Sequence, residues 1–132
     1  MAQPSSWIAI VDDDPAVLKA LARLLRTRAV ESRTYVSAQD FLAALPEGLP
    51  ECLIVDLQMS DMGGLELQHH LNREGIMIPT IVITAHQEAD MRQLCEAAGA
   101  VTYLLKPLQD THLLASIEKV RTKAARARAD RP

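Results

Sequence analysis

The chain alternates five short apolar segments with five longer segments of helical periodicity, and this alternation constrains its fold more than any other feature. The expected strands cover residues 7–11, 31–36, 52–57, 78–84 and 101–105. Strands that alternate with helices form a parallel sheet with helices on both faces, and right-handed crossovers leave few other topologies. The sequence therefore predicts an α/β fold with a doubly wound, five-stranded parallel sheet and five helices.

The expected helices follow the strands and carry their own start signals. In the first, apolar residues recur at helical spacing from Val17 to Leu25, after Asp14 as a cap and Pro15 in the first turn. Ser37 is expected to cap the second helix in the same way. The remaining helices are expected at 64–75, at 88–100 and from Asp110 onward.

Composition supports one soluble domain and argues against nucleic-acid binding by this domain. The 132 residues are 48% hydrophobic and 23% charged, which is typical of globular proteins. A net charge of −3 and an aromatic content of 3% supply neither a basic surface nor stacking platforms for bases. We expect DNA to be contacted only through a further domain.

The cysteines and the apolar segments indicate a cytoplasmic protein with no membrane partner. Cys52 and Cys95 lie far apart, without metal-ligand spacing, and are expected to be small core residues in a reducing compartment. The first residues lack the features of a signal peptide, and no segment approaches the roughly 20 apolar residues of a membrane span.

Acidic residues stand where the expected strands end. Asp12 and Asp13 follow the first strand, and Asp56 lies at the end of the third. Ligands of open α/β sheets bind at the carboxyl ends of the strands, and a strand order of 2-1-3-4-5 makes these two strands neighbours. Thr84 ends the fourth strand and Lys106 follows the fifth, so we expect all five side chains at one rim.

Such a cluster needs a cation, because crowded carboxylates resist joint ionisation. Carboxylate and carbonyl oxygens suit a hard ion, Mg²⁺ above all, with Mn²⁺ as an alternative. Lys106 adds a fixed positive charge. A divalent ion and a lysine beside a carboxylate can stabilise charge on a transferring phosphoryl group.

These motifs resemble the receiver domain of two-component response regulators. The resemblance rests on VDDD at 11–14, DLQMSDMGGLEL at 56–67, TA at 84–85 and KP at 106–107, and it covers about residues 7–122. FLAALP, GLELQHHL, ITAH and GAVTYLLKPL are most similar to the FixJ-like subgroup, whose receivers usually precede a LuxR-type output domain. The resemblance implies a flavodoxin-like (CheY-like) receiver domain over residues 1–122, with 123–132 as a tail or the start of a linker.

The resemblance also implies a phosphorylation site. Asp56 would be the phosphoacceptor, taking its phosphoryl group from a sensor histidine kinase. Mg²⁺ would be bound by Asp12, Asp13, Asp56 and the backbone carbonyl of Gln58. Lys106 would pair with the phosphoryl oxygens. The domain would be a signalling switch, with self-phosphorylation from phosphodonors and autodephosphorylation as its only chemistry.

Further implied roles concern the response to phosphorylation. Thr84 would hydrogen-bond the phosphoryl group, and Tyr103 would turn from exposed to buried. Gln58 and His86 occupy the positions that tune the lifetime of the acyl phosphate. The bond before Pro107 is expected to be cis. A shift of the fourth helix, fifth strand and fifth helix would control the output, which is expected to be transcription, with a homodimer on phosphorylation as one expected assembly.

The sequence departs from the family pattern at Ser60, where proline usually follows the residue equivalent to Met59. We expect slower or weaker phosphorylation from this change. Two alternatives stay open at this point. One is a pseudo-receiver, an interaction module that never takes phosphate. The other is a Mg²⁺-dependent phosphohydrolase that forms an aspartyl phosphate, although such enzymes use a D-x-D pattern and a cap that this chain has no room for.

Other conspicuous residues have simpler structural explanations. Asp61, Gly63 and Gly64 are expected to serve the turn into the third helix. His69 and His70 lack a partner at metal-ligand spacing and are expected on a solvated face.

Overall fold

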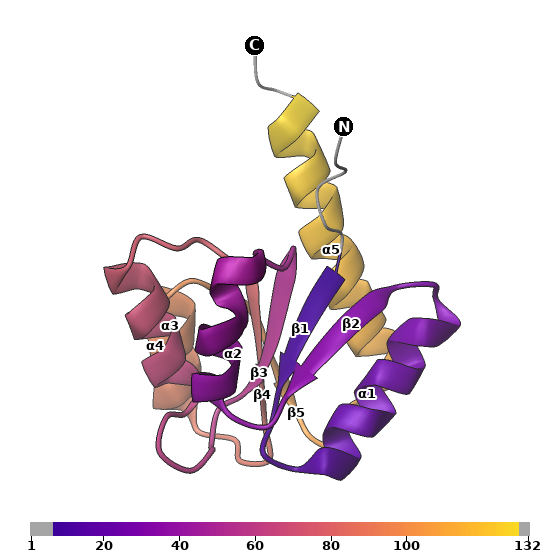
Figure 1. Cartoon of the computed structure of the whole chain (residues 1–132). Coiled ribbons are helices and arrows are strands. Elements are labelled where there is room, and N and C mark those ends of the chain that lie inside the picture. The colour runs from indigo at the N-terminus through magenta and orange to yellow at the C-terminus, as the bar shows by residue number, and fades with distance from the viewer. Residues whose placement is uncertain (1–6, 130–132) are drawn as a thin grey trace.

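Five parallel strands form the centre of the molecule (Figure 1). The computed structural model describes the backbone of residues 7–129 and the side chains of residues 7–123. The sheet order is β2-β1-β3-β4-β5, and every strand pair is parallel. This confirms the predicted fold. The strands are β1 (Trp7–Val11), β2 (Glu31–Tyr35), β3 (Cys52–Asp56), β4 (Thr80–Thr84) and β5 (Ala100–Leu105).

Helices cover both faces of the sheet (Figure 1). One face packs against α1 (Pro15–Thr27) and α5 (Asp110–Ala129). The other packs against α2 (Ala38–Ala44), α3 (Gly64–Arg73) and α4 (Ala89–Ala97), and a short 3₁₀ helix, η1 (Leu45–Glu47), follows α2. The expected caps are present, since Asp14 accepts a hydrogen bond from the Ala16 N–H and Ser37 accepts one from the Asp40 N–H.

The central strands are mostly apolar because their side chains alternate between two cores. In β3, Cys52 and Ile54 pack with α1 and α5, whereas Leu53 and Val55 pack with the other three helices. All four are fully buried. Cys95 is buried in the second of these cores, so both cysteines are core residues, as predicted.

Several element boundaries differ from the predicted ones. The strand expected from residue 78 begins at Thr80, because Pro79 has no N–H to donate to a neighbouring strand. The helix expected over 64–75 ends at Arg73, and Gly75 follows it at a φ of +71°. The helix expected over 88–100 is shorter at both ends.

The last helix extends past the expected domain boundary at residue 122. Its backbone is helical to Ala129, so residues 123–129 continue α5, while residues 130–132 lie outside the described part of the chain. Figure 1 shows this end of α5 projecting beyond the sheet. Among the described helices, none combines the length and the apolar character needed to cross a bilayer.

Candidate functional site

Three carboxylates from two neighbouring strands meet at the carboxyl edge of the sheet. Asp12 and Asp13 directly follow β1, and Asp56 is the last residue of β3. One carboxylate oxygen of each lies within 4.8 Å of the other two. The pairing of β1 with β3 therefore brings together residues separated by more than 40 positions in the sequence.

Asp12 is the most constrained of the three. Its side chain is fully buried, and both oxygens have partners. Oδ1 accepts a hydrogen bond from the Asp14 N–H at 2.9 Å, and Oδ2 accepts one from Lys106 Nζ at 2.9 Å. Asp13, in contrast, is exposed. Asp12 is thus fixed by the protein, whereas Asp13 faces solvent at the mouth of the site.

Lys106 connects the two buried carboxylates. Besides its bond to Asp12, its Nζ lies 3.4 Å from Asp56 Oδ2. Partial burial lowers the pKa of the ammonium group, but the hydrogen bond and charge of Asp12 and the charge of Asp56 outweigh burial and raise it above its usual value. Lys106 is therefore a permanent cation in the site.

The surroundings of Asp56 disfavour its charged form, whereas those of Lys106 favour the charged form of the lysine. Burial, followed by the nearby charge of Asp12, raises the pKa of its carboxyl group, although Lys106 and the Gln58 N–H oppose this rise. The Gln58 N–H donates to Asp56 Oδ1 over 3.4 Å. Only 6% of the residue is exposed. The Asp56 carboxylate is accordingly a crowded anion that gains from additional positive charge.

The donor set fits a hard divalent cation. The cluster has three carboxylates and one ammonium group, which pairs with Asp12 and Asp56, so an excess of negative charge remains. Oxygen ligands of this kind favour Mg²⁺ or Mn²⁺ over softer metals. The described part of the chain offers no other grouping of histidine, cysteine or acidic side chains for a metal.

Thr84 and Tyr103 meet at the backbone of His86. Thr84 Oγ1 accepts a hydrogen bond from the His86 N–H at 3.1 Å and lies 3.4 Å from the His86 carbonyl oxygen. The hydroxyl of Tyr103 donates to the same carbonyl over 3.5 Å. Tyr103 is only 7% exposed, so the structure holds this ring in its buried position.

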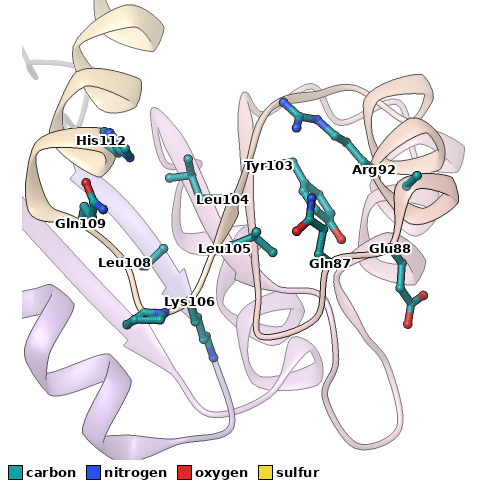
Figure 2. Close-up of a pocket in the computed structure, with 12 residues that line it drawn as sticks. Gln87, Glu88, Arg92, Tyr103, Leu104, Leu105, Lys106, Leu108, Gln109 and His112 are labelled. Atoms are coloured by element: carbon teal, nitrogen blue, oxygen red, sulfur yellow. The ribbon is translucent and has the colours of Figure 1, made fainter.

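A hollow of about 610 Å³ lies beside these residues, between α4, β5 and the start of α5. Figure 2 shows Tyr103, Leu105 and Lys106 along β5 and the loop after it, with Arg92 and Glu88 on one side and His112 on the other. The Lys106–Pro107 bond in this loop is cis. The elements expected to respond to phosphorylation thus share one face.

The loop from β3 to α3 is shaped around Asp56. Asp61 has a φ of +67°, in keeping with the turn expected there, and Ser60 is exposed. A Cβ on Gly64 would lie 2.9 Å from the Asp56 carbonyl oxygen. Met59 and Met62 pack against the core. The loop therefore approaches the Asp56 backbone too closely for a side chain at Gly64.

Sequence reasoning missed two backbone groups at the site. The Asp14 N–H orients Asp12, and the His86 carbonyl joins Thr84 to Tyr103. Backbone groups are the same in every residue type, so the sequence carries no direct signal of them. The predicted set of side chains, in contrast, lies at the predicted edge of the sheet.

Comparisons with known proteins identify relatives of this arrangement. The family model described as "Response regulator receiver domain" matches residues 8–118. The chain is 38% identical over 123 residues to the transcriptional regulatory protein FixJ of Rhizobium meliloti (strain 1021), covering 93% of this chain and 60% of the relative. It is 36% identical over 132 residues to the response regulator protein TodT of Pseudomonas putida, covering 100% and 58%.

A solved structure shows the same fold at similar identity. The crystal structure of FixJ-N superposes with a TM-score of 0.81 at 37% identity, over 89% of this chain and 94% of that one. The chain spans about 60% of the length of the two curated relatives, so it corresponds to one part of those proteins.

Proposed function

The chain belongs to the response regulator receiver family, and on this premise we propose that it is a phosphorylation-dependent switch whose phosphoacceptor is Asp56. The observation that carries the proposal is the position of Lys106 Nζ, 2.9 Å from Asp12 and 3.4 Å from Asp56, beside the exposed Asp13. A fixed cation next to a buried carboxylate is what an incoming phosphoryl group requires.

The proposed reaction is a single phosphoryl transfer. A carboxylate oxygen of Asp56 attacks the phosphorus of a phosphohistidine on a sensor kinase. The new P–O bond forms as the P–N bond breaks, and the departing imidazole keeps the electron pair and takes up a proton. Lys106 stabilises negative charge on the phosphoryl oxygens, and Asp12 holds Lys106 in place through their hydrogen bond.

Asp12, Asp13, Asp56 and the Gln58 carbonyl are the groups that would hold Mg²⁺. When bound, the ion would neutralise charge on the carboxylates and on the phosphoryl oxygens. Asp13 is the exposed member of the cluster, so its carboxylate would be the first to meet an ion arriving from solvent.

The proposed switch begins at Thr84. Its hydroxyl now bonds to the backbone of His86, and a phosphoryl group on Asp56 would offer it a stronger, charged acceptor. If the Thr84 hydroxyl bonded to the phosphoryl group and no longer to the His86 carbonyl, the His86 backbone would be free to move, and its hydrogen bond with Tyr103 would break. The face formed by α4, β5 and α5 would then shift its equilibrium between two arrangements. Gln58 and His86 are proposed to tune the lifetime of the acyl phosphate.

The output is proposed from the relatives. FixJ is named a transcriptional regulatory protein, and this chain covers 60% of it. We therefore propose that the receiver controls transcription through a separate output domain that contacts DNA, with a sensor histidine kinase as the upstream partner. A homodimer through the face formed by α4, β5 and α5 is the proposed assembly on phosphorylation.

The proposal is tested by incubating the chain with Mg²⁺ and acetyl phosphate and measuring its intact mass. We expect the gain of one phosphoryl group in the wild type and none in the Asp56→Asn variant. Asp61→Asn is the matched control, because Asp61 lies in the same loop, is exposed, and has a φ that asparagine tolerates. It should gain the phosphoryl group as the wild type does.

Two results would overturn the proposal. An unchanged mass of the wild type would favour a pseudo-receiver, and undiminished phosphorylation of Asp56→Asn would exclude Asp56 as the acceptor. Many turnovers of a small phosphate ester per chain, in place of one bound equivalent, would favour a phosphohydrolase.

A further inference from the structure

Two amide side chains of α3 hold the C-terminal end of α4. Gln68 Nε2 donates to the Cys95 carbonyl oxygen at 3.2 Å, and Asn72 Nδ2 donates to the Ala98 carbonyl oxygen at 3.0 Å. The two donors are four positions apart in α3, so they lie one turn apart on the same side of that helix. Their acceptors belong to the last turn of α4 and to its C-cap, where carbonyl groups have few partners within the helix.

The supporting helix α3 is itself fixed by the core. Leu67 and Leu71, which precede the two amides in the sequence, are 0% and 3% exposed. The helix begins at Gly64, in close contact with the Asp56 carbonyl. The two amides therefore join the end of α4 to a part of the molecule that is packed along its length.

Gln68 contributes little net stability through its contact. Its Oε1 has no hydrogen-bond partner within the part of the chain that the structure describes, and a buried acceptor without a donor costs at least as much as one hydrogen bond contributes. The Cys95 carbonyl also accepts a bond from the Ala98 N–H at 3.2 Å, so it keeps a partner without Gln68. The main consequence of this amide is therefore the position it gives to α4.

The N-terminal end of α4 has weaker support. Residues 85–90 are exposed, and Glu88, the N-cap residue, adds no side-chain hydrogen bond to the described backbone of the helix. The buried residue of α4 is Cys95, near its end, whereas Met91, near its start, is half-buried. Packing and hydrogen bonds thus both favour the C-terminal end.

The proposed switch acts at the weaker end. The bonds from Thr84 and Tyr103 reach the backbone of His86, three residues before α4 begins. Phosphorylation would break these bonds, whereas the bonds from α3 would remain. A helix of nine residues is about 13 Å long, so a tilt of about 10° around its last turn would move its first residue by roughly 2 Å.

We propose that Gln68 and Asn72 are positioning residues that fix the last turn of α4, so that phosphorylation tilts the helix around this turn. The inference rests on the proposed phosphorylation of Asp56. The moving end carries Arg92, which lines the hollow near Lys106 (Figure 2), whereas the fixed end lies beside the starts of β4 and β5. The tilt therefore reshapes the hollow and leaves the opposite edge of the sheet unchanged.

The test measures distances between spin labels on introduced cysteines, before and after phosphorylation by acetyl phosphate and Mg²⁺. Lys19→Cys on α1 carries the reference label, and Asp90→Cys or Ala97→Cys carries the second label at either end of α4. All three positions are exposed, whereas the native Cys52 and Cys95 are fully buried, so the labels attach to the introduced thiols. Intact mass shows whether each sample carries the phosphoryl group.

We expect the distance to the label at position 90 to change by about 2 Å and the distance to the label at position 97 by less than about a third of that. In a Gln68→Met/Asn72→Ala background the two distances should change by similar amounts. This double variant should still gain the phosphoryl group, because neither residue belongs to the acidic cluster. The matched control, Gln39→Met/Arg73→Ala, changes two exposed helical residues and should keep the wild-type difference.

Hydrogen exchange tests the anchor without phosphorylation. The N–H groups of Ala98 and Gly99 close the last turn of α4, and the Arg92 N–H bonds to the Glu88 carbonyl in the first turn. In the double variant without spin labels, exchange at Ala98 and Gly99 should accelerate about fivefold, the effect of one lost hydrogen bond. Exchange at Arg92 should keep its wild-type rate.

Three outcomes would overturn the inference. These are equal distance changes at both ends of α4 in the wild type, a wild-type difference that persists in the double variant, and exchange that accelerates equally at Arg92 and Ala98. An unchanged mass of the wild type would overturn the proposed function, and the tilt with it, whereas the exchange rates would still decide whether the two amides hold the last turn.

Discussion

At the scale of single residues, burial raises the pKa of two ionisable side chains in β3, Cys52 and Asp56, but it suits the role of only one of them. Cys52 begins this strand and Asp56 ends it. Burial raises the pKa of the Cys52 thiol from 9.0 to about 12, so the thiol stays neutral and packs as an apolar group. Burial also raises the pKa of Asp56, but this residue must carry a charge to act as a nucleophile. Stability and the proposed function therefore conflict at Asp56 and agree at Cys52.

The conflict predicts that Asp56→Asn stabilises the metal-free protein. The folded state raises the pKa of this carboxyl group, so ionisation costs folding free energy at every pH above the unfolded value of about 3.9. We expect the Tm of the variant in EDTA at pH 7.5 to exceed that of the wild type by about 4 °C, roughly 1 kcal/mol. The advantage should shrink as the pH falls through the folded pKa. An equal or lower Tm at pH 7.5 would contradict the assigned electrostatics.

The raised pKa of the Cys52 thiol predicts that the folded protein loses stability at alkaline pH. Its pKa is raised on folding, so its contribution is complete below pH 9 and is lost as the pH rises toward 12. Between pH 8 and pH 10, the free energy of unfolding of the wild type should fall by about 1.4 kcal/mol more than that of Cys52→Ala. Urea titrations at the two pH values measure this difference. Parallel pH profiles would show that Cys52 ionises as readily in the folded state as in the unfolded one.

At the scale of elements, the loop between β3 and α3 determines where Asp56 lies. α3 begins at Gly64, immediately against the Asp56 carbonyl. We expect Gly64→Ala to lower stability by roughly 2 kcal/mol, because the methyl group meets backbone atoms that cannot move aside independently. Phosphorylation by acetyl phosphate should slow roughly tenfold, since the displaced loop carries Asp56 with it.

Gly75→Ala is the matched control for this prediction. Gly75 follows the same helix at its other end, has a φ of +71°, and would place its Cβ in open space. The variant should lose roughly 1 kcal/mol through backbone strain while keeping the wild-type phosphorylation rate. Equal phosphorylation rates in the two variants would mean that the close approach at Gly64 does not position Asp56.

The helices and strands could be predicted from the sequence more fully than the contacts within the candidate site. The strands were predictable because β1, β3 and β4 are rich in apolar residues on both faces. Among the ends that shifted, the start of β4 follows Pro79, and the end of α3 precedes Gly75. The carboxylates were predictable because parallel strands end at a common edge. The pairing of Lys106 with Asp12 was not, because adjacent aspartates are equivalent in sequence and only side-chain packing distinguishes them.

At the scale of the whole molecule, the sheet separates two regions with different chemistry. Charged residues gather at the carboxyl edge, whereas a mostly apolar cavity of about 330 Å³ lies at the opposite edge, beside the starts of β4 and β5. The cavity was not predictable from sequence, because it is what remains after helices α3, α4 and α5 have packed. α4 and α5 contribute to the cavity and also flank the hollow near Lys106.

The acidic edge predicts that a divalent ion stabilises the entire fold. A ligand that binds only the folded state adds a free energy set by its concentration relative to Kd. At about ten times Kd, MgCl₂ should add roughly 1.4 kcal/mol, which is measurable as a rise in Tm at constant ionic strength. Asp13→Asn should abolish this increment. Asp14→Asn should keep it, because Asp14 caps α1 through the Ala16 N–H and is not a member of the cluster. Of these two adjacent aspartates, only Asp13 lies in the cluster with Asp56, so a bound ion must distinguish them. If MgCl₂ raised the Tm of both variants equally, the ion would act through general screening and not by binding at the cluster.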